Sequence, residues 1–268
     1  MISKRPHLIR SHLIRSHSIR SMDSPVISYL SHLQDAFNES ISANWRTSRS
    51  ELDFQLALNQ EIAELIDSSY TIDGKTYSLA WKWWKGCSGE RTTDRIIWAD
   101  IHPKVKANIK IELTDCLFFL LSQLDLYDGS SGREGEGDRG SLMSSNDWEN
   151  IMNIPRLSLN RRPKDAIEIL LKLADRLSFN IAAYYLAKFT LNHIRQLTGY
   201  KNGTYTKVID GVEDNELLHE IIKDITTEDL EVQFPHFCTY IMGRVYDTFK
   251  IPDKDRKYYS DWTGVDLL

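Results

Sequence analysis

Apolar residues recur every three or four positions along most of the chain, which is the spacing of one face of a helix. The pattern begins after Ser24 and predicts helices near residues 26–37, 53–66, 107–126, 164–177, 179–198, 213–224 and 233–249. Alternating apolar and polar runs with hairpin turns are nearly absent. The chain is therefore predicted to be all-α.

Two kinds of segment interrupt this pattern. Residues 69–80 and 86–106 are expected to form loops around the tryptophan-rich block WKWWK at 81–85. Residues 128–147, DGSSGREGEGDRGSLMSSND, are expected to be disordered, because they have little apolar surface to offset the entropy lost on ordering. A Gly-x-Gly-x-x-Gly spacing within them lacks the strand and helix that a dinucleotide site needs, so it is assigned no function.

The first 22 residues contain five basic and no acidic side chains, and they repeat HLIRS, HLIRS and HSIRS. This composition is typical of a mitochondrial transit segment, but a disordered tail, or upstream sequence before a start at Met22, has the same features. We expect a tail over 1–22, one helical domain over 23–250 and a C-terminal tail over 251–268.

Composition narrows the functional classes. The net charge of -5 argues against a duplex DNA partner, and the apolar runs are too short for a membrane span. Three cysteines far apart in the chain fit free thiols in a reducing compartment. We therefore expect an intracellular protein, cytoplasmic or nuclear, or mitochondrial if the first residues are a transit segment.

Two pairs of acidic residues stand among apolar neighbours. Glu61 and Glu64 lie in NQEIAELIDS, and Glu112 and Asp115 lie in IKIELTDCLFF. At this spacing each pair shares a helix face and repels. One interpretation is an edge where a solvated face meets an apolar one. Because two such pairs lie on consecutive apolar helices, we favour a site for Mg²⁺ or Mn²⁺, whose remaining ligands are typically water and phosphate.

A basic stripe follows in the sequence. Lys188, Asn192 and Arg195 fall on one side of a predicted helix, which is followed by a turn rich in tyrosine and lysine. Such a stripe can bind an oligophosphate, although a solvated basic face has the same pattern. The tryptophans of WKWWK could form core or the apolar wall of a base-binding slot.

Several blocks resemble those of the dimeric, all-α dUTPases of trypanosomatid type, which are related to MazG-like nucleotide pyrophosphohydrolases. They are LQDAFN, EIAELIDS, AWKWWK, IELTDCLFF, AAYYLAKFTLNHIRQLTGYKNGTYTKV and GVEDNELLHEIIKD, and they span roughly residues 24–123 and 164–250. The resemblance implies a MazG-like helical bundle, a homodimer, and hydrolysis of dUTP to dUMP and pyrophosphate, or of dUDP to dUMP and phosphate.

The resemblance also implies roles for individual residues. Two or three Mg²⁺, with Mn²⁺ as a substitute, would be held by Glu61, Glu64, Glu112 and Asp115, and Glu61 or Glu64 would orient the attacking water. The phosphates would be bound by Lys188, Asn192, Arg195, Tyr200, Lys201, Lys207 and Asn215. The base and deoxyribose would be bound by Gln34, Asn38, Trp84 and Phe119.

Two alternatives remain open at this point. A MazG-like pyrophosphohydrolase could act on another nucleotide such as dCTP, and the role of Gln34 and Asn38 would discriminate between the two. A helical interaction protein could keep the fold without catalysis, but it would have no use for four carboxylates together with the basic stripe. The chain also departs from the family's pattern by about a dozen extra residues near 69–80, and neither a nucleic acid nor a membrane is expected as a partner.

Overall fold

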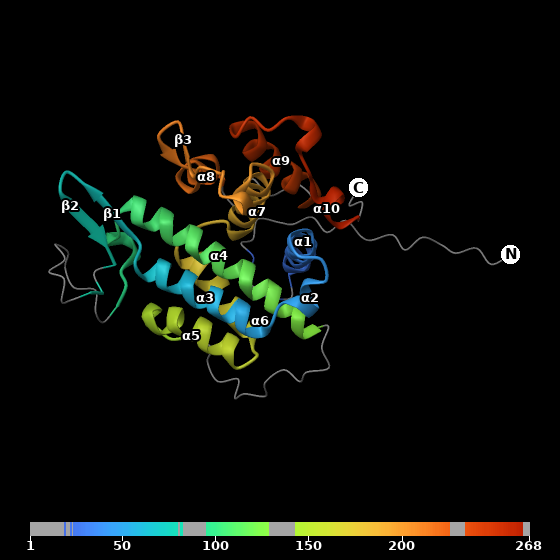
Figure 1. Cartoon of the computed structure of the whole chain (residues 1–268). Helices are drawn as coiled ribbons and strands as arrows, with labels where there is room; N and C mark the ends of the chain where they lie inside the picture. Colours follow the sequence, from blue (N-terminus) through green and yellow to red (C-terminus); the bar gives the residue numbers. More distant parts are fainter. Residues whose placement is uncertain are drawn as a thin grey trace.

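The computed structural model describes residues 19, 22, 24–79, 81–82, 95–128, 143–225 and 234–264. Within these ranges helices form the body of the molecule, and each of the two sheets is a pair of short strands (Figure 1). The all-α prediction is therefore confirmed. None of the helices among the described residues is long and apolar enough to cross a membrane.

The bounds of the elements follow the apolar pattern closely. The α-helices of the described residues are α1 (Pro25–Ile41), α2 (Trp45–Ser48), α3 (Glu51–Ile66), α4 (Pro103–Asp128), α5 (Asp147–Leu159), α6 (Pro163–Arg176), α7 (Ile181–Leu197), α8 (Asp214–Ile222), α9 (Phe234–Thr248) and α10 (Tyr259–Thr263). The strands are β1 (Ser69–Ile72), β2 (Lys75–Ser78), β3 (Val208–Ile209) and β4 (Val212–Glu213). Each of the seven predicted ranges corresponds to one helix.

Capping side chains fix where the first long helices begin. The Ser24 hydroxyl accepts a hydrogen bond from the backbone N–H of Val26 at the start of α1. At the start of α3, Ser50 and Asp53 form a capping box in which each side chain accepts a hydrogen bond from the other's backbone. These bonds satisfy backbone donors that have no partner inside the helix, so α3 starts two residues earlier than its apolar pattern indicates.

Helix α4 lies at the centre of the molecule and packs against α1, α3, α6 and α7 (Figure 1). Apolar side chains cover most of its circumference, as expected for a helix surrounded by others. Those buried include Ile109, Ile111, Leu113, Leu117 and Leu120. A polar residue on α4 therefore either faces a neighbouring helix or opens into a site between helices.

The prediction of a loop over residues 69–80 is wrong, because β1 and β2 form an antiparallel hairpin there. Its turn contains Asp73 and Gly74, both with positive φ, which matches the right-handed twist of paired strands. The ring of His102 lies 5.0 Å from that of Tyr70 and 4.5 Å from that of Tyr77, so the hairpin is packed against the residues that precede α4.

Parts of the two expected tails contact the helical body. Ile19 is buried, and the backbone N–H of Met22 donates to a carboxylate oxygen of Glu168 at 2.8 Å. In the expected C-terminal tail, α10 places Tyr259 in the core. Most of the low-complexity stretch, residues 129–142, lies outside the described residues, whereas 143–147 lead into α5.

Candidate active site

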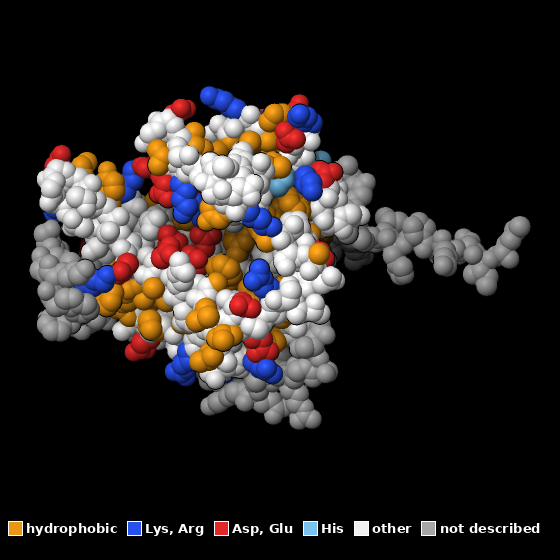
Figure 2. Space-filling view, viewed as in Figure 1, with side chains coloured by type: hydrophobic (Ala, Val, Ile, Leu, Met, Phe, Trp, Pro, Cys, Tyr) orange, Lys and Arg blue, Asp and Glu red, His pale blue; other side chains and the backbone are white. Residues whose placement is uncertain are grey.

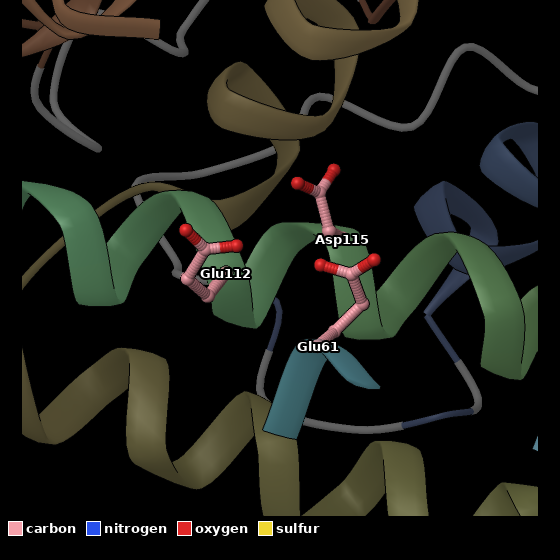
Figure 3. A group of neighbouring side chains, drawn as sticks. All are labelled: Glu61, Glu112 and Asp115. Atoms are coloured by element: carbon pink, nitrogen blue, oxygen red, sulfur yellow. The ribbon is translucent and has the colours of Figure 1, made fainter. Parts of the chain in front are cut away.

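Three carboxylates meet where α3 packs against α4. Glu61 comes from α3, Glu112 and Asp115 come from α4, and ligand oxygens of the three lie within 4.8 Å of one another. Figure 3 shows the three side chains converging from the two helices. We call them the acidic trio. Because Glu112 is buried and the other two are partly buried, the trio is not the edge of a solvated face.

The electrostatics of the acidic trio are unfavourable without a counter-charge. Burial, together with the charges of Asp115 and Glu112, raises the pKa of Glu61 to about 8. Burial and the charge of Asp115 raise the pKa of Glu112 to about 7. Converging carboxylate oxygens with a raised proton affinity are the donor set that a hard divalent cation takes. The residues present therefore fit Mg²⁺ or Mn²⁺.

Glu64, the fourth predicted carboxylate, lies outside this trio. Its side chain is exposed and accepts a hydrogen bond from Nε2 of Gln60 at 2.9 Å. Its charge still contributes to the raised pKa of Glu61, so it is close enough to influence the site. The structure therefore brings three of the four predicted carboxylates together and leaves Glu64 beside them.

The basic stripe of α7 faces the acidic trio. Nζ of Lys188 lies 2.7 Å from a carboxylate oxygen of Asp115 and donates to Oδ1 of Asn215 at 3.0 Å. Nη2 of Arg195 also donates to Oδ1 of Asn215, at 3.4 Å. Both cationic side chains are buried, so the interpretation of a solvated basic face is wrong for them. Figure 2 shows a group of acidic side chains near the middle of the molecule in this view, with basic side chains close by.

Arg195 is held by a buried acid at the start of α8. Its Nε and Nη2 donate to the two carboxylate oxygens of Asp214 at 2.9 and 2.8 Å, and its Nη1 donates to Oδ1 of Asn192 at 3.3 Å. The hydroxyl of Tyr205 donates to the same carboxylate at 2.8 Å. Although burial opposes it, the hydrogen bonds from Arg195 and Tyr205 lower the pKa of Asp214.

Tyr200, Lys201 and Lys207 lie on the exposed turn between α7 and α8. Nζ of Lys201 donates to the carbonyl of Ile41 at 2.8 Å, and the ring of Tyr200 lies 6.2 Å from that of Tyr205. These contacts of Lys201 and Tyr200 are with α1 and with the turn.

The residues predicted to bind the base are connected through α1. Nε2 of Gln34 donates to Oδ1 of Asn38 at 2.9 Å, and Nδ2 of Asn38 donates to the hydroxyl of Ser122 on α4 at 2.9 Å. Phe119 lies on α4 three residues before Ser122 and is partly buried. Trp84 lies outside the described residues.

Comparison with known proteins decides the family. A model of the dUTPase family matches residues 26–200, which is more than half of the chain. The chain belongs to the dUTPase family. Family membership makes it an enzyme of dUTP hydrolysis, a dUTP diphosphatase. A search of curated proteins finds no match.

The part matched to the dUTPase family includes the acidic trio, Gln34 and Asn38, and the basic stripe up to Tyr200. Asp214 and Asn215 follow it in the chain. Sequence reasoning did not single out Asp214, although GVEDN contains it, and it noted Tyr205 only as one of the tyrosines in the turn that follows the basic stripe. The signal for Asp214 was its position directly before the predicted Asn215. Acidic residues are also common at the start of a helix, so the position alone did not indicate a site residue.

Proposed function

We propose that this enzyme hydrolyses dUTP to dUMP and pyrophosphate with two or three Mg²⁺ held by the acidic trio, Mn²⁺ being a possible substitute. The convergence of Glu61, Glu112 and Asp115 beside Lys188 is the observation that supports the proposal. When bound, the cations supply positive charge that offsets the negative charge developing on the attacking and leaving oxygens. Glu64, exposed beside the trio, would complete the ligand set.

In this proposal Glu61 orients the attacking water. A carboxylate with a raised pKa accepts a proton readily at neutral pH, so ionised Glu61 would take the proton from the water as the new bond forms. The oxygen attacks in line at the β-phosphorus, the bond between that phosphorus and the oxygen that bridges it to the α-phosphorus breaks, and dUMP leaves while the β- and γ-phosphates depart as pyrophosphate. Glu64 is the second choice for this role, and no covalent intermediate is required.

Lys188 and Arg195 would bind the phosphates. Lys188 acts as a compact positive charge beside the acidic trio, whereas Asp214 and Asn192 hold the guanidinium of Arg195 in one orientation. A fixed guanidinium loses less conformational entropy when it binds phosphate. The exposed Tyr200, Lys201 and Lys207 would reach the phosphates only if the turn closes over them. Asn192 and Asn215 would complete the set of phosphate-binding residues that the family resemblance implies.

Gln34 and Asn38 would read the uracil. A buried amide that pairs with the wrong base leaves a polar atom without a partner, so amides discriminate strongly between bases. Phe119, with Trp84, would form the apolar floor under base and sugar. A dry apolar wall at the deoxyribose disfavours a 2'-hydroxyl, which would exclude UTP.

Two further features belong to the proposal. The same site would cleave dUDP to dUMP and phosphate, because attack at the β-phosphorus is possible in both nucleotides. A homodimer is supported by exposed apolar side chains on α3 and α5, namely Leu52, Leu56, Met152 and Leu159. Hydrophobic side chains are visible over this face in Figure 2, and such surfaces commonly mark contacts between proteins.

The test is ³¹P NMR of the purified protein incubated separately with dUTP, dCTP, UTP and dTTP, in the presence of Mg²⁺ and in the presence of a chelator. Pyrophosphate released from dUTP alone, and only with Mg²⁺, is the expected result. Hydrolysis that persists with the chelator would refute the metal dependence. Equal release from dCTP would refute uracil specificity and leave a pyrophosphohydrolase of broader range.

A further inference from the structure

A chain of hydrogen bonds links the two predicted base-reading amides to both neighbouring helices. The hydroxyl of Tyr185 on α7 donates to Oε1 of Gln34 at 2.8 Å, and Nε2 of Gln34 donates to Oδ1 of Asn38 at 2.9 Å. Nδ2 of Asn38 donates to the hydroxyl oxygen of Ser122 at 2.9 Å. The Ser122 hydroxyl donates in turn to the carbonyl of Phe118 at 2.9 Å. We call this series the amide relay.

The amide relay has a direction, because every amide in it has one donating and one accepting end. The hydroxyl of Ser122 has a single hydrogen, which it donates within α4, so its oxygen accepts from Asn38. This orientation turns Oδ1 of Asn38 towards Gln34. Oε1 of Gln34 is then left to accept from Tyr185.

Burial makes this direction costly to change. Ser122 is 1% exposed, Gln34 is 4% exposed and Tyr185 is fully buried, so solvent cannot replace a partner that one of these three loses, whereas Asn38 is partly exposed. The reversed order would require the Tyr185 hydroxyl to donate to the carbonyl of Leu30, at 3.2 Å instead of 2.8 Å. Both amides and both hydroxyls would have to turn together, because Asn38 turned alone would face Gln34 donor to donor and Gln34 turned alone would face Asn38 acceptor to acceptor.

The direction of the amide relay decides what the two amides offer to a base. Each amide keeps one N–H and one oxygen lone pair outside the relay, and reversing the amide exchanges their positions. Uracil presents an accepting O4 next to a donating N3–H, whereas cytosine presents a donating amino group next to an accepting N3. An amide oriented for one base is therefore oriented wrongly for the other.

We propose that Ser122 and Tyr185 are positioning residues that set the preference for uracil over cytosine by fixing the direction of the amide relay. Neither residue needs to touch the nucleotide. The proposal rests on the proposed function, in which Gln34 and Asn38 contact the base. Loss of either hydroxyl removes one end of the relay, so that both amide orientations leave a group without a partner and neither is strongly preferred.

The experiment compares kcat/KM for dUTP and dCTP in Ser122→Ala and Tyr185→Phe. We expect the ratio of the two values to fall about tenfold or more in each variant, the size expected for one lost hydrogen bond. Hydrolysis itself should persist, because neither residue belongs to the acidic trio. Ser122→Thr, which keeps a hydroxyl, should retain the ratio.

Tyr184→Phe is the matched control. Tyr184 is the neighbour of Tyr185 on α7 and is also buried, but its hydroxyl is hydrogen-bonded to Nδ1 of His219 at 2.7 Å and does not belong to the amide relay. Its loss should leave the ratio unchanged even if the protein becomes less stable. A ratio that falls equally in Tyr184→Phe would show a general effect of packing and overturn the proposal.

The failure of this inference can be told apart from failure of the proposed function. Wild-type protein that hydrolyses dUTP and dCTP equally would refute the uracil specificity on which both depend. Wild-type protein that prefers dUTP, with both variants keeping that preference, would overturn the role of Ser122 and Tyr185 alone.

If the variants do not fold, a measurement on the wild-type protein can still test the direction of the amide relay. In its NMR spectrum the side-chain amide protons of Asn38 should show NOEs to the β-protons of Ser122. NOEs from those amide protons to the side chain of Gln34 instead would show the reversed order and overturn the proposal.

Discussion

Nζ of Lys188 lies 2.7 Å from a carboxylate oxygen of Asp115, so the basic stripe of α7 and the acidic trio meet in a single contact. The Lys188 side chain is only 4% exposed. Burial raises the pKa of Glu61 and Glu112, and the charge of Lys188 opposes that rise in both. Lys188 therefore stabilises the ionised forms of these carboxylates. In the proposed function it would also provide a positive charge for a phosphate bound beside them.

Lys188→Met should reduce kcat/KM for dUTP by about a hundredfold, the loss typical of removing one group that stabilises developing charge. Methionine keeps much of the apolar stem but neither the charge nor the contact with Asp115. Steady-state release of pyrophosphate measures the effect. Lys172→Met is the control, because the side chain of that lysine is 43% exposed and its Nζ lies 3.9 Å from a carboxylate oxygen of Glu168 on the same helix. Equal kinetics in the two variants would refute the role of Lys188.

Glu61→Gln should abolish turnover while the helical circular dichroism stays unchanged. The amide fills the same volume but cannot accept the proton from water. Removing one of three neighbouring carboxylates also relieves repulsion, so the metal-free variant should melt no lower than the wild type. Glu64→Gln should lose less activity, since Glu64 is exposed and lies outside the acidic trio. An active Glu61→Gln protein would remove Glu61 from the catalytic site.

The helices were predictable because helical periodicity depends only on the spacing of apolar residues within each segment. Predicted residues 53–66 and observed α3 (Glu51–Ile66) differ only at the capped end. Helix α5 was missed because Pro155 lies inside it and because low-complexity sequence precedes it, and both features argue against a helix. The hairpin of β1 and β2 was missed because its mostly exposed strands have no buried alternation.

Part of the geometry at the candidate site was predictable from the sequence. Glu112 and Asp115 stand one turn apart, so their common face follows from spacing alone. By contrast, Tyr185 and Gln34 are 151 positions apart, and Asn38 and Ser122 are 84 positions apart. Contacts of that kind depend on how α1, α4 and α7 pack together. A single sequence therefore indicates which side chains on one helix lie together more readily than which side chains of distant helices form hydrogen bonds.

Asp214→Asn should raise KM for dUTP and lower the stability of the protein. Asp214 is fully buried and pairs with Arg195, so loss of its charge leaves a buried guanidinium without its partner, at a cost of about 3–5 kcal/mol. Arg195 would also lose the contact that orients it towards the phosphates. Thermal unfolding and steady-state kinetics measure the two effects.

Asp147→Asn is the matched control for that variant. Asp147 is also buried, and it accepts hydrogen bonds from Arg176 and from Nε1 of Trp98 as Asp214 does from Arg195 and Tyr205. Its loss should destabilise the protein without changing KM, although by less than the loss of Asp214, because the Arg176 side chain is 37% exposed. If both variants raise KM alike, the effect comes from lost stability and Asp214 has no specific role at the site.

We expect residues 1–18 to be dispensable for stability and activity, and Ile19 to contribute to stability. Ile19 is 8% exposed and belongs to the core, so Ile19→Ala should lower the free energy of unfolding by about 2 kcal/mol. Removal of residues 1–18 should leave the melting temperature and the activity unchanged. A large loss of stability on removal of residues 1–18 would show that the first residues belong to the fold.

Binding of Mg²⁺ should stabilise the protein more as the pH rises. The pKa of Glu61 is raised from 4.5 in its ordinary environment to about 8. Between these two values the folded protein keeps a proton that the unfolded chain has released, so without metal its stability falls as the pH rises. Bound Mg²⁺ takes the place of that proton, and protons compete with it less at higher pH.

The measurement is the melting temperature with Mg²⁺ and with chelator, at about pH 6, below both raised pKa values, and at about pH 9, above them. The increase caused by Mg²⁺ should be larger at the higher pH. Glu61→Gln should flatten the pH dependence in chelator, because it removes the carboxylate with the higher of the two raised pKa values, that of Glu112 being about 7. An equal increase at both pH values in the wild type would mean that Mg²⁺ binds somewhere other than the acidic trio.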